Sequence, residues 1–203
     1  MKSTYRSNTA FVFGWIWVAF VAINAVDLTL RYTGKSSLVA GAVLGALTAI
    51  VYVTALRPGT VLGEEGLRVR NPFRTWSMPW ASVDGVRVSH SIAVDYADGK
   101  VLRLWTPTAS ARERAKATRR GVPKGQRGGL LRTEAVRTKA EQAAAEALAG
   151  KTHADWVGEQ IVERSEAARR RDQAPPPVRG TWAIDALVAC ALAIALVVAA
   201  FLV

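Results

Sequence analysis

Apolar and basic residues alternate in one stretch of the chain, residues 64–83, which reads EEGLRVRNPFRTWSMPWASV. Within it, residues 67–70 place two aliphatic side chains on one face of an extended strand and two arginines on the other, because successive strand side chains point to opposite faces. Asn71-Pro72 is a turn signal, and residues 75–78 are typical of a returning strand. The stretch therefore predicts a β-hairpin that buries its aliphatic face.

Further short strands follow this hairpin. Residues 83–88 alternate again, and residues 92–96 and 101–105 are rich in strand-forming residues. The pair Asp98-Gly99 between the last two is a strong hairpin signal. We therefore predict five or six short antiparallel strands between residues 59 and 106.

Three apolar runs, residues 10–30, 38–56 and 182–203, are long enough to cross a membrane as helices. We expect the first two to form a retained hairpin and not a cleaved signal peptide, since the first run is long and the second follows at once. Gly41 and Gly45 form a G-x-x-x-G spacing, which favours close packing against the first span or against another copy. The single cysteine, Cys190, lies in the last run, so no internal disulfide is possible.

The chain is strongly basic, with 27 Lys and Arg against 16 Asp and Glu and a net charge of +11. Such an excess favours anionic partners. Arginines follow the second apolar run and precede the third, so the positive-inside rule places the N-terminus and the middle region in the cytoplasm. We predict a multi-pass protein of the inner (plasma) membrane.

The region after the strands divides into three expected segments. Residues 107–130 are basic and poor in apolar residues, which predicts a flexible segment. Residues 131–171 have helical composition, with a capping box at Thr152 and Asp155 that starts a second helix. Residues 172–181 form a Pro-rich linker. The basic side chains expected to contact an anionic surface are Arg112, Arg114, Lys116, Arg119, Arg120, Lys124 and Arg127.

The order of these motifs resembles a known family. Residues 64–74, followed by Met78-Pro79-Trp80, look like the pattern of small actinobacterial membrane proteins that carry a bacterial pleckstrin-homology (PH) domain. The resemblance covers residues 38–106. It implies membrane α-helical anchors plus a small antiparallel β PH-like domain with C-terminal helices, an α+β fold. A full PH domain has seven strands and a capping helix, and bacterial members are not expected to bind phosphoinositides.

Catalytic motifs are not found. The sequence contains no Gly-rich phosphate loop, no metal-spaced His/Cys set and no nucleophile elbow. His90 and His153 are expected to be ordinary surface residues, and Ser89-His90-Ser91 has no supporting oxyanion signal. We therefore predict a protein that is not an enzyme and that needs no cofactor or metal.

The expected function is a membrane-anchored binding or scaffolding module that engages a protein partner or anionic lipid headgroups. The candidate headgroup contacts are Arg68, Arg70 and Arg74, which could equally form a solvated outer face. Nucleic acid is not expected as a partner, because the basic segment lacks interleaved aromatic residues. The alternative is a small transporter or channel subunit, or an accessory protein, built on the three apolar helices. In an oligomer, its path would be lined by Asn24, Asp27 and Asp185.

Overall fold

Two antiparallel sheets make up the β part of the protein in this computed structural model, which describes residues 3–97, 99–121, 151–171 and 177–202. Sheet A contains, in spatial order, β1 (Ser3–Tyr5), β2 (Gly59–Leu62), β3 (Gly66–Arg70), β4 (Arg74–Pro79) and β8 (Arg179–Trp182). Sheet B contains β5 (Val83–Val88), β6 (Ser91–Tyr96) and β7 (Lys100–Thr108). The predicted antiparallel β fold is confirmed.

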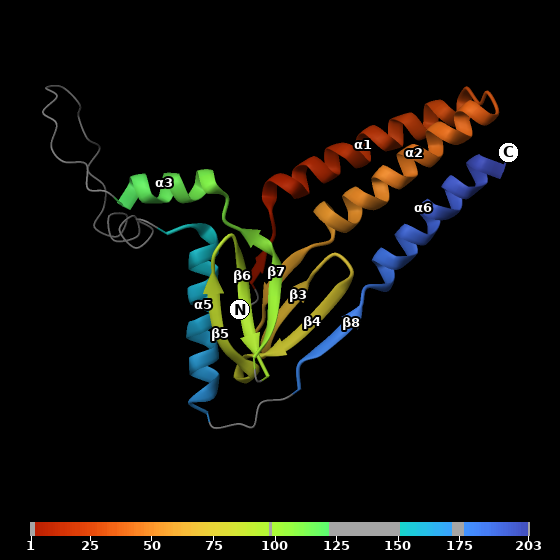
Figure 1. The fold of residues 1–203 in the computed structure, drawn as a ribbon. Coiled ribbons are helices and arrows are strands. Elements are labelled where there is room, and N and C mark those ends of the chain that lie inside the picture. The colour runs from red at the N-terminus through yellow and green to blue at the C-terminus, as the bar shows by residue number, and fades with distance from the viewer. Residues whose placement is uncertain (1–2, 98, 122–150, 172–176, 203) are drawn as a thin grey trace, which may run out of the picture.

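The core lies between the two sheets and helix α5 (His153–Arg169), as Figure 1 shows. α5 packs against β5 and against the short 3-10 turn Trp80–Ser82. Burying each large aliphatic side chain stabilises the fold by about 1.5–3 kcal/mol. The central buried side chains are Leu67, Val69 and Met78 of sheet A, Ile92, Val94 and Leu104 of sheet B, and Val157 and Ile161 of α5.

Helix α5 begins as the sequence predicts. The Thr152 hydroxyl accepts a hydrogen bond from the backbone N–H of Asp155, at 3.2 Å, and the Asp155 carboxylate accepts one from the backbone N–H of Thr152, at 2.8 Å. These reciprocal bonds satisfy backbone donors that the first turn of a helix leaves unpaired. The capping box therefore fixes where α5 starts and which of its faces meets the sheets.

Three long apolar helices extend from one end of the two sheets (Figure 1). They are α1 (Asn8–Leu30), α2 (Lys35–Val51), which continues through the π-helical turn Tyr52–Leu56, and α6 (Ile184–Leu202). Each is long and apolar enough to cross a membrane, and many of their large apolar side chains are exposed, as lipid-facing residues would be.

The two glycines of the G-x-x-x-G spacing have different surroundings. A Cβ added at Gly45 would lie 2.7 Å from Leu196 Cδ1 of α6, whereas one added at Gly41 would meet nothing within 4 Å. α2 also makes most of its helix–helix contact with α6 and less with α1. The close approach therefore involves α6 and Gly45, and not the first span.

Sheet A connects directly to all three long helices. Arg6 and Ser7 alone separate β1 from α1, and Arg57 and Pro58 alone separate the π-helical turn from β2. Only Ala183 separates β8 from α6. The bases of the three helices are therefore held at one sheet.

Two expected boundaries differ from the structure. The segment 107–130 was predicted to be flexible, but residues 111–121 form helix α3 (Ala111–Gly121). Its start is stabilised because the Glu113 carboxylate accepts from the Ser110 backbone N–H, at 2.8 Å, and the Ser110 hydroxyl accepts from the Glu113 N–H, at 3.1 Å. Residues 122–150, which include the rest of this segment and the first predicted helix, lie outside the described residues.

The predicted linker 172–181 also ends differently. Residues 179–182 form β8, which pairs with β4 in register from Arg74↔Trp182 to Ser77↔Arg179. Trp182, predicted to begin the third span, therefore belongs to a strand, and the helix starts at Ile184. Residues 172–176 are not among the described residues.

Candidate functional site

The three arginines predicted to contact headgroups take two different positions. Arg68 and Arg70 both lie exposed on the outer face of β3, because the strand alternates buried and exposed side chains. Arg74, across the turn, stacks on aromatic rings. Its guanidinium carbon lies 4.4 Å from the ring centre of Trp182 and 6.0 Å from that of Trp76. The structure therefore groups Arg68 with Arg70 and assigns Arg74 to the β4–β8 contact.

Arg68 and Arg70 line a cavity of about 350 Å³ at the base of the long helices, together with two arginines from other segments. We call it the arginine pocket. Arg6 comes from the link between β1 and α1, and Arg57 from the link between the π-helical turn and β2. The remaining lining residues are Tyr52, Leu56, Thr75 and Asp185.

The strand register explains why the pocket forms. Tyr5 pairs with Thr60, which brings the next residue, Arg6, opposite Gly59, and Gly59 in turn pairs with Arg70. Gly59 leaves room for the Arg6 side chain, since a Cβ at this position would lie 3.2 Å from both Cγ and Nε of Arg6. Arg6, directly after β1, and Arg70 of β3 therefore lie on either side of Gly59 of β2, which forms a glycine floor between them.

Arg57 holds the pocket together. Its side chain is almost completely buried, and its Nε donates to Asp185 Oδ2 at 2.8 Å. One terminal nitrogen donates to Thr75 Oγ1 at 3.0 Å, and the other donates to the Asn71 carbonyl oxygen. Asp185 also accepts a hydrogen bond from the Tyr52 hydroxyl, at 2.8 Å. Arg57 therefore has a structural role, and it connects α6 to sheet A and to the end of the second long helix.

The other arginines leave the pocket with an excess of positive charge. Arg6 Nε is buried without a hydrogen-bond partner. Among the described residues, Arg68 and Arg70 make no side-chain hydrogen bond or ion pair. Asp185, the one carboxylate lining the pocket, is already shared by Arg57 and Tyr52. An anion with several oxygens, such as a phosphate, would supply the acceptors that these guanidinium groups need.

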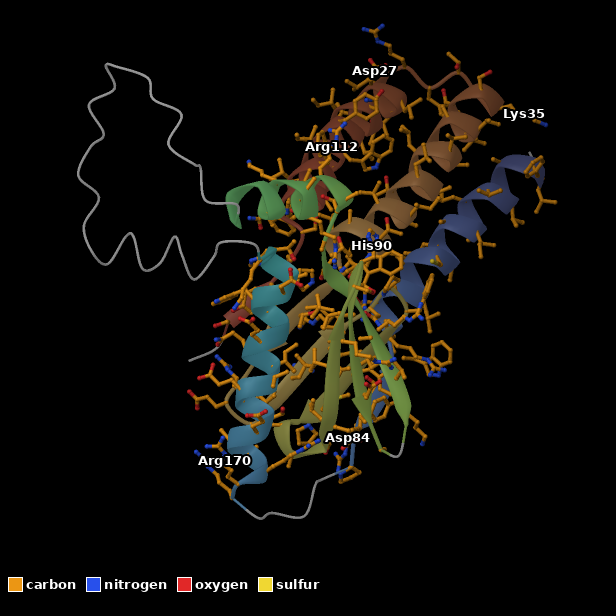
Figure 2. All side chains as sticks on the ribbon, turned by 60° about the vertical axis from the view of Figure 1, so that its left-hand side comes forward. Asp27, Lys35, Asp84, His90, Arg112 and Arg170 are labelled. Carbon is orange, nitrogen blue, oxygen red and sulfur yellow. The ribbon has the colours of Figure 1, made fainter. Side chains whose placement is uncertain are left out.

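The predicted basic segment is only partly described. Arg112, Arg114 and Lys116 lie exposed on α3, and Figures 1 and 2 show this helix at the end of the domain from which the long helices extend. Arg114 also donates to the Ser89 carbonyl oxygen of the loop after β5. The side chains of Arg119 and Arg120, and all of Lys124 and Arg127, lie outside the described part of the chain.

The polar residues considered for a transport path do not come together. Figure 2 places Asp27 at the far end of the helices from the domain, where it pairs with Arg31 at 3.0 Å. Asn24 donates to the carbonyl oxygen of Phe20 in its own helix. Asp185 lies at the opposite end, in the arginine pocket. Within the single chain these side chains therefore line no common path.

The histidines are placed by packing. His90 is exposed beside the turn between β5 and β6. His153 stacks on Trp156, with ring centres 6.2 Å apart, and lies 5.6 Å from the ring of Tyr5. Among the described residues, no group of three or more His, Cys, Asp or Glu side chains could hold a metal ion.

Sequence reasoning missed two members of the site. Arg6 and Arg57 each lie beside a predicted span, and neither was predicted as a site residue. Arg6 lies beside Gly59 and Arg70 only because β1 pairs with β2. β1 has only three residues, and its sequence shows no alternation of apolar and polar side chains. The sequence signal for both residues is a basic side chain directly beside a predicted span, and this signal does not indicate which other residues the side chain will contact.

Comparison with protein families gives a match to the model described as "Bacterial PH domain", over residues 57–150. Comparison with curated proteins and comparison with solved structures each gave no match. The matched region begins at Arg57 and contains strands β2 to β7. With β1, which comes from before the helical hairpin, the described sheets reach the seven strands of a PH fold, and β8 is an addition. Residues 57–150 therefore place a bacterial PH domain in this chain, joined to three long apolar helices.

Proposed function

We propose that the protein is a non-enzymatic, membrane-anchored binding module whose arginine pocket holds the phosphate of an anionic lipid headgroup at the cytoplasmic surface. The observation that carries this proposal is the set of arginines Arg6, Arg68 and Arg70, which line one cavity with no ion-pair partner among the described residues. PH domains bind lipids or proteins, and the charge of this pocket favours the lipid.

The position of the pocket agrees with a headgroup ligand. Tyr52 lies near the end of the candidate span Lys35–Leu56, and Asp185 lies near the start of the candidate span Ile184–Leu202; both residues line the pocket. Polar and aromatic residues at the ends of spans lie at the depth of lipid headgroups. A headgroup phosphate could therefore reach the arginines while its acyl chains remain beside the helices.

The cytoplasmic placement rests on two observations. β1 precedes the helical hairpin and β2 follows it, and they pair in one sheet, so the N-terminus and the PH domain lie on the same side of the hairpin. The four arginines of the pocket and the exposed basic residues of α3 gather at this end. Basic residues beside spans favour the cytoplasmic face.

The test uses the full chain, because β1 and β8 lie outside any fragment limited to the matched region. The purified protein, in a neutral detergent, is mixed with equal amounts of phosphatidylcholine and phosphatidylglycerol, and native mass spectrometry measures which lipid stays bound. Arg6→Gln/Arg70→Gln removes two charges from the pocket. Arg170→Gln/Arg171→Gln removes two charges from the far end of α5, which Figure 2 shows away from the long helices.

We expect the wild-type protein to retain phosphatidylglycerol selectively. The pocket variant should lose about thirtyfold in this selectivity, since each arginine near an anionic headgroup contributes about 1 kcal/mol. The control variant should retain it. Equal retention of the two lipids by the wild-type protein, or equal losses in the two variants, would reject the headgroup site.

A further inference from the structure

A second surface of opposite charge lies between α5 and β5. Its floor consists of Val86 and Val88 of β5 and Val162 of α5, all half-buried, and its volume is about 450 Å³. Its rim consists of Glu159, Glu163 and Glu166, with Asp155 of the capping box at one end. We call this surface the acidic groove, and it stands out in a chain whose net charge is +11.

The groove depends on how closely α5 approaches β5. A Cβ added at Gly158 would lie 2.5 Å from Val88 Cγ2, so only glycine permits this separation. The three glutamates follow at spacings of four and three residues, which puts them on one face of the helix. Figure 1 shows α5 running alongside β5, and the strand residues that line the groove beside the helix are Val86 and Val88.

β5 is also an edge strand. The order of sheet B is β5-β6-β7, and no other strand among the described residues pairs with the outer edge of β5. In the part of the chain that the structure describes, side chains hold the two ends of the strand. Arg169 donates to the carbonyl oxygen of Val83, the first residue of β5, and Arg114 donates to that of Ser89, directly after the last. The backbone between these ends can pair with an added extended segment.

The partners of the rim glutamates within the described residues are weak. Glu163 accepts from the Gln160 side chain at 3.2 Å, and Glu166 lies 3.9 Å from Arg170. Glu159 pairs with Lys151 at 2.7 Å, with both side chains substantially exposed. Exposed pairs of this kind contribute about 0–1 kcal/mol, so incoming cations can replace them at little cost.

We propose that the acidic groove binds an extended, basic segment of another membrane protein by adding it as a strand to β5. Alternate residues of such a segment are about 7 Å apart, and successive turns of α5 are about 5 Å apart, so each inward-facing side chain meets about one turn of the acidic rim. Long basic side chains suit both parts of the groove, because their aliphatic stems can cover the valines while their charged ends reach the glutamates.

The choice of partner follows from charge and location. Segments rich in Lys and Arg flank the cytoplasmic ends of membrane spans. A PH domain tethered beneath the same membrane would meet these segments at high effective concentration. This step rests on the cytoplasmic placement proposed above, whereas binding to the groove does not depend on the lipid site.

The test measures binding of a labelled peptide, acetyl-TKTKTKT-amide, to the full chain in nanodiscs of phosphatidylcholine, by fluorescence anisotropy. Two control peptides are acetyl-PKPKPKP-amide, which keeps the charge but cannot donate strand hydrogen bonds, and acetyl-TETETET-amide. Glu163→Gln is compared with Glu65→Gln, a matched loss of an exposed carboxylate outside the groove. The melting temperature of each variant checks that it is folded.

We expect the Thr-Lys peptide alone to bind, Glu163→Gln to weaken it about threefold to tenfold, and Glu65→Gln to leave it unchanged. Glu163→Lys/Glu166→Lys should bind the Thr-Glu peptide instead. Equal binding of the proline peptide would overturn strand addition, and equal losses in the two Gln variants would overturn the groove as the site. If the protein is dimeric in nanodiscs and binds the peptide only after the dimer dissociates, the occupant of the groove would be a second copy of this chain and not another membrane protein. If the wild-type protein binds the Thr-Lys peptide but shows no selectivity for phosphatidylglycerol, only the headgroup proposal would be rejected.

Discussion

Arg57 and Asp185 join the second and third long helices at the domain surface, through a bond of 2.8 Å between Arg57 Nε and Asp185 Oδ2. The two partners differ in exposure, since the arginine side chain is 5% exposed and the aspartate side chain 48%. The sequence predicted the arginine only as a charge beside a span, and the aspartate only as a residue that would line a transport path. Their pairing makes both part of the link between membrane and sheet.

Asp185→Ala should lower the free energy of unfolding by about 1–3 kcal/mol, because it leaves the buried Arg57 guanidinium with one partner fewer. The loss should be smaller than for a fully buried pair, since water reaches the aspartate. Thermal unfolding of the full chain in one detergent measures it. Asp27→Ala is the control, because its pair with Arg31 is exposed and contributes about 0–1 kcal/mol. Equal losses in the two variants would contradict a special role for Asp185.

Gly59→Ala should reduce the phosphatidylglycerol selectivity of the arginine pocket. The new Cβ would lie 3.2 Å from Arg6 Cγ and Nε, so the arginine side chain must move away from the glycine floor. Native mass spectrometry with the same lipid mixture measures the change. Gly41→Ala, where a Cβ meets nothing within 4 Å, should have no effect. Unchanged selectivity in Gly59→Ala would show that the position of Arg6 is unimportant.

Gly45→Val and Gly41→Val should differ in stability although both glycines belong to one G-x-x-x-G spacing. A side chain at Gly45 would collide with Leu196 of α6, whereas one at Gly41 would enter open space. We expect Gly45→Val to cost about 1–3 kcal/mol through overpacking, read as a lower melting temperature in detergent. If Gly41→Val proved as damaging, that glycine would have to contact something outside the single chain.

Acidification should weaken the start of α5. Burial alone would raise the pKa of Asp155, but hydrogen bonds from the Thr152 hydroxyl and backbone N–H, with the charges of Arg114 and Lys151, hold this pKa below its ordinary value. A carboxylate whose pKa is lower in the folded state stabilises the fold fully above its unfolded pKa, about 3.9, and this contribution is lost as the pH falls through the folded pKa.

The melting temperature, measured from pH 6 down to pH 3, tests this expectation. The wild-type protein should lose more stability over this interval than Asp155→Asn, which is already weaker at pH 6 because it lacks the charge. Asp84→Asn gives a control, since its carboxylate is exposed and pairs with Arg169 at 3.2 Å. Parallel curves for wild-type protein and Asp155→Asn would contradict the role of the carboxylate.

Local sequence patterns correctly predicted the elements whose own residues contain a strand, turn or helix-capping pattern. The alternation in residues 67–70 became β3, and the Asp98-Gly99 turn signal lies between β6 and β7. The Thr152 capping box became the start of α5. These patterns are local because each depends on residues within one or two turns or on one strand.

The missed elements depend on distant parts of the chain. β1 and β8 have three and four residues, and each exists because a longer strand supplies its hydrogen bonds. The arginine pocket also depends on contacts between distant parts of the chain. Arg68 and Arg70 could be predicted from their strand, but their neighbour Arg6 reaches them only through the pairing of β1 with β2. Arg74 could not be separated from them without knowledge of Trp182.

The order of sheet A has a consequence for biosynthesis. The sheet takes one edge from residues 3–5 and the other from residues 179–182, with the helical hairpin between its first two strands. A ribosome must therefore synthesise the chain as far as β8 before the last edge can close, and the hairpin must turn back before the first edge can pair. Sheet A can therefore be complete only after the helical hairpin has formed and the chain has been synthesised as far as its third apolar helix. The moment at which β1 becomes resistant to protease during synthesis would show when the hairpin has formed.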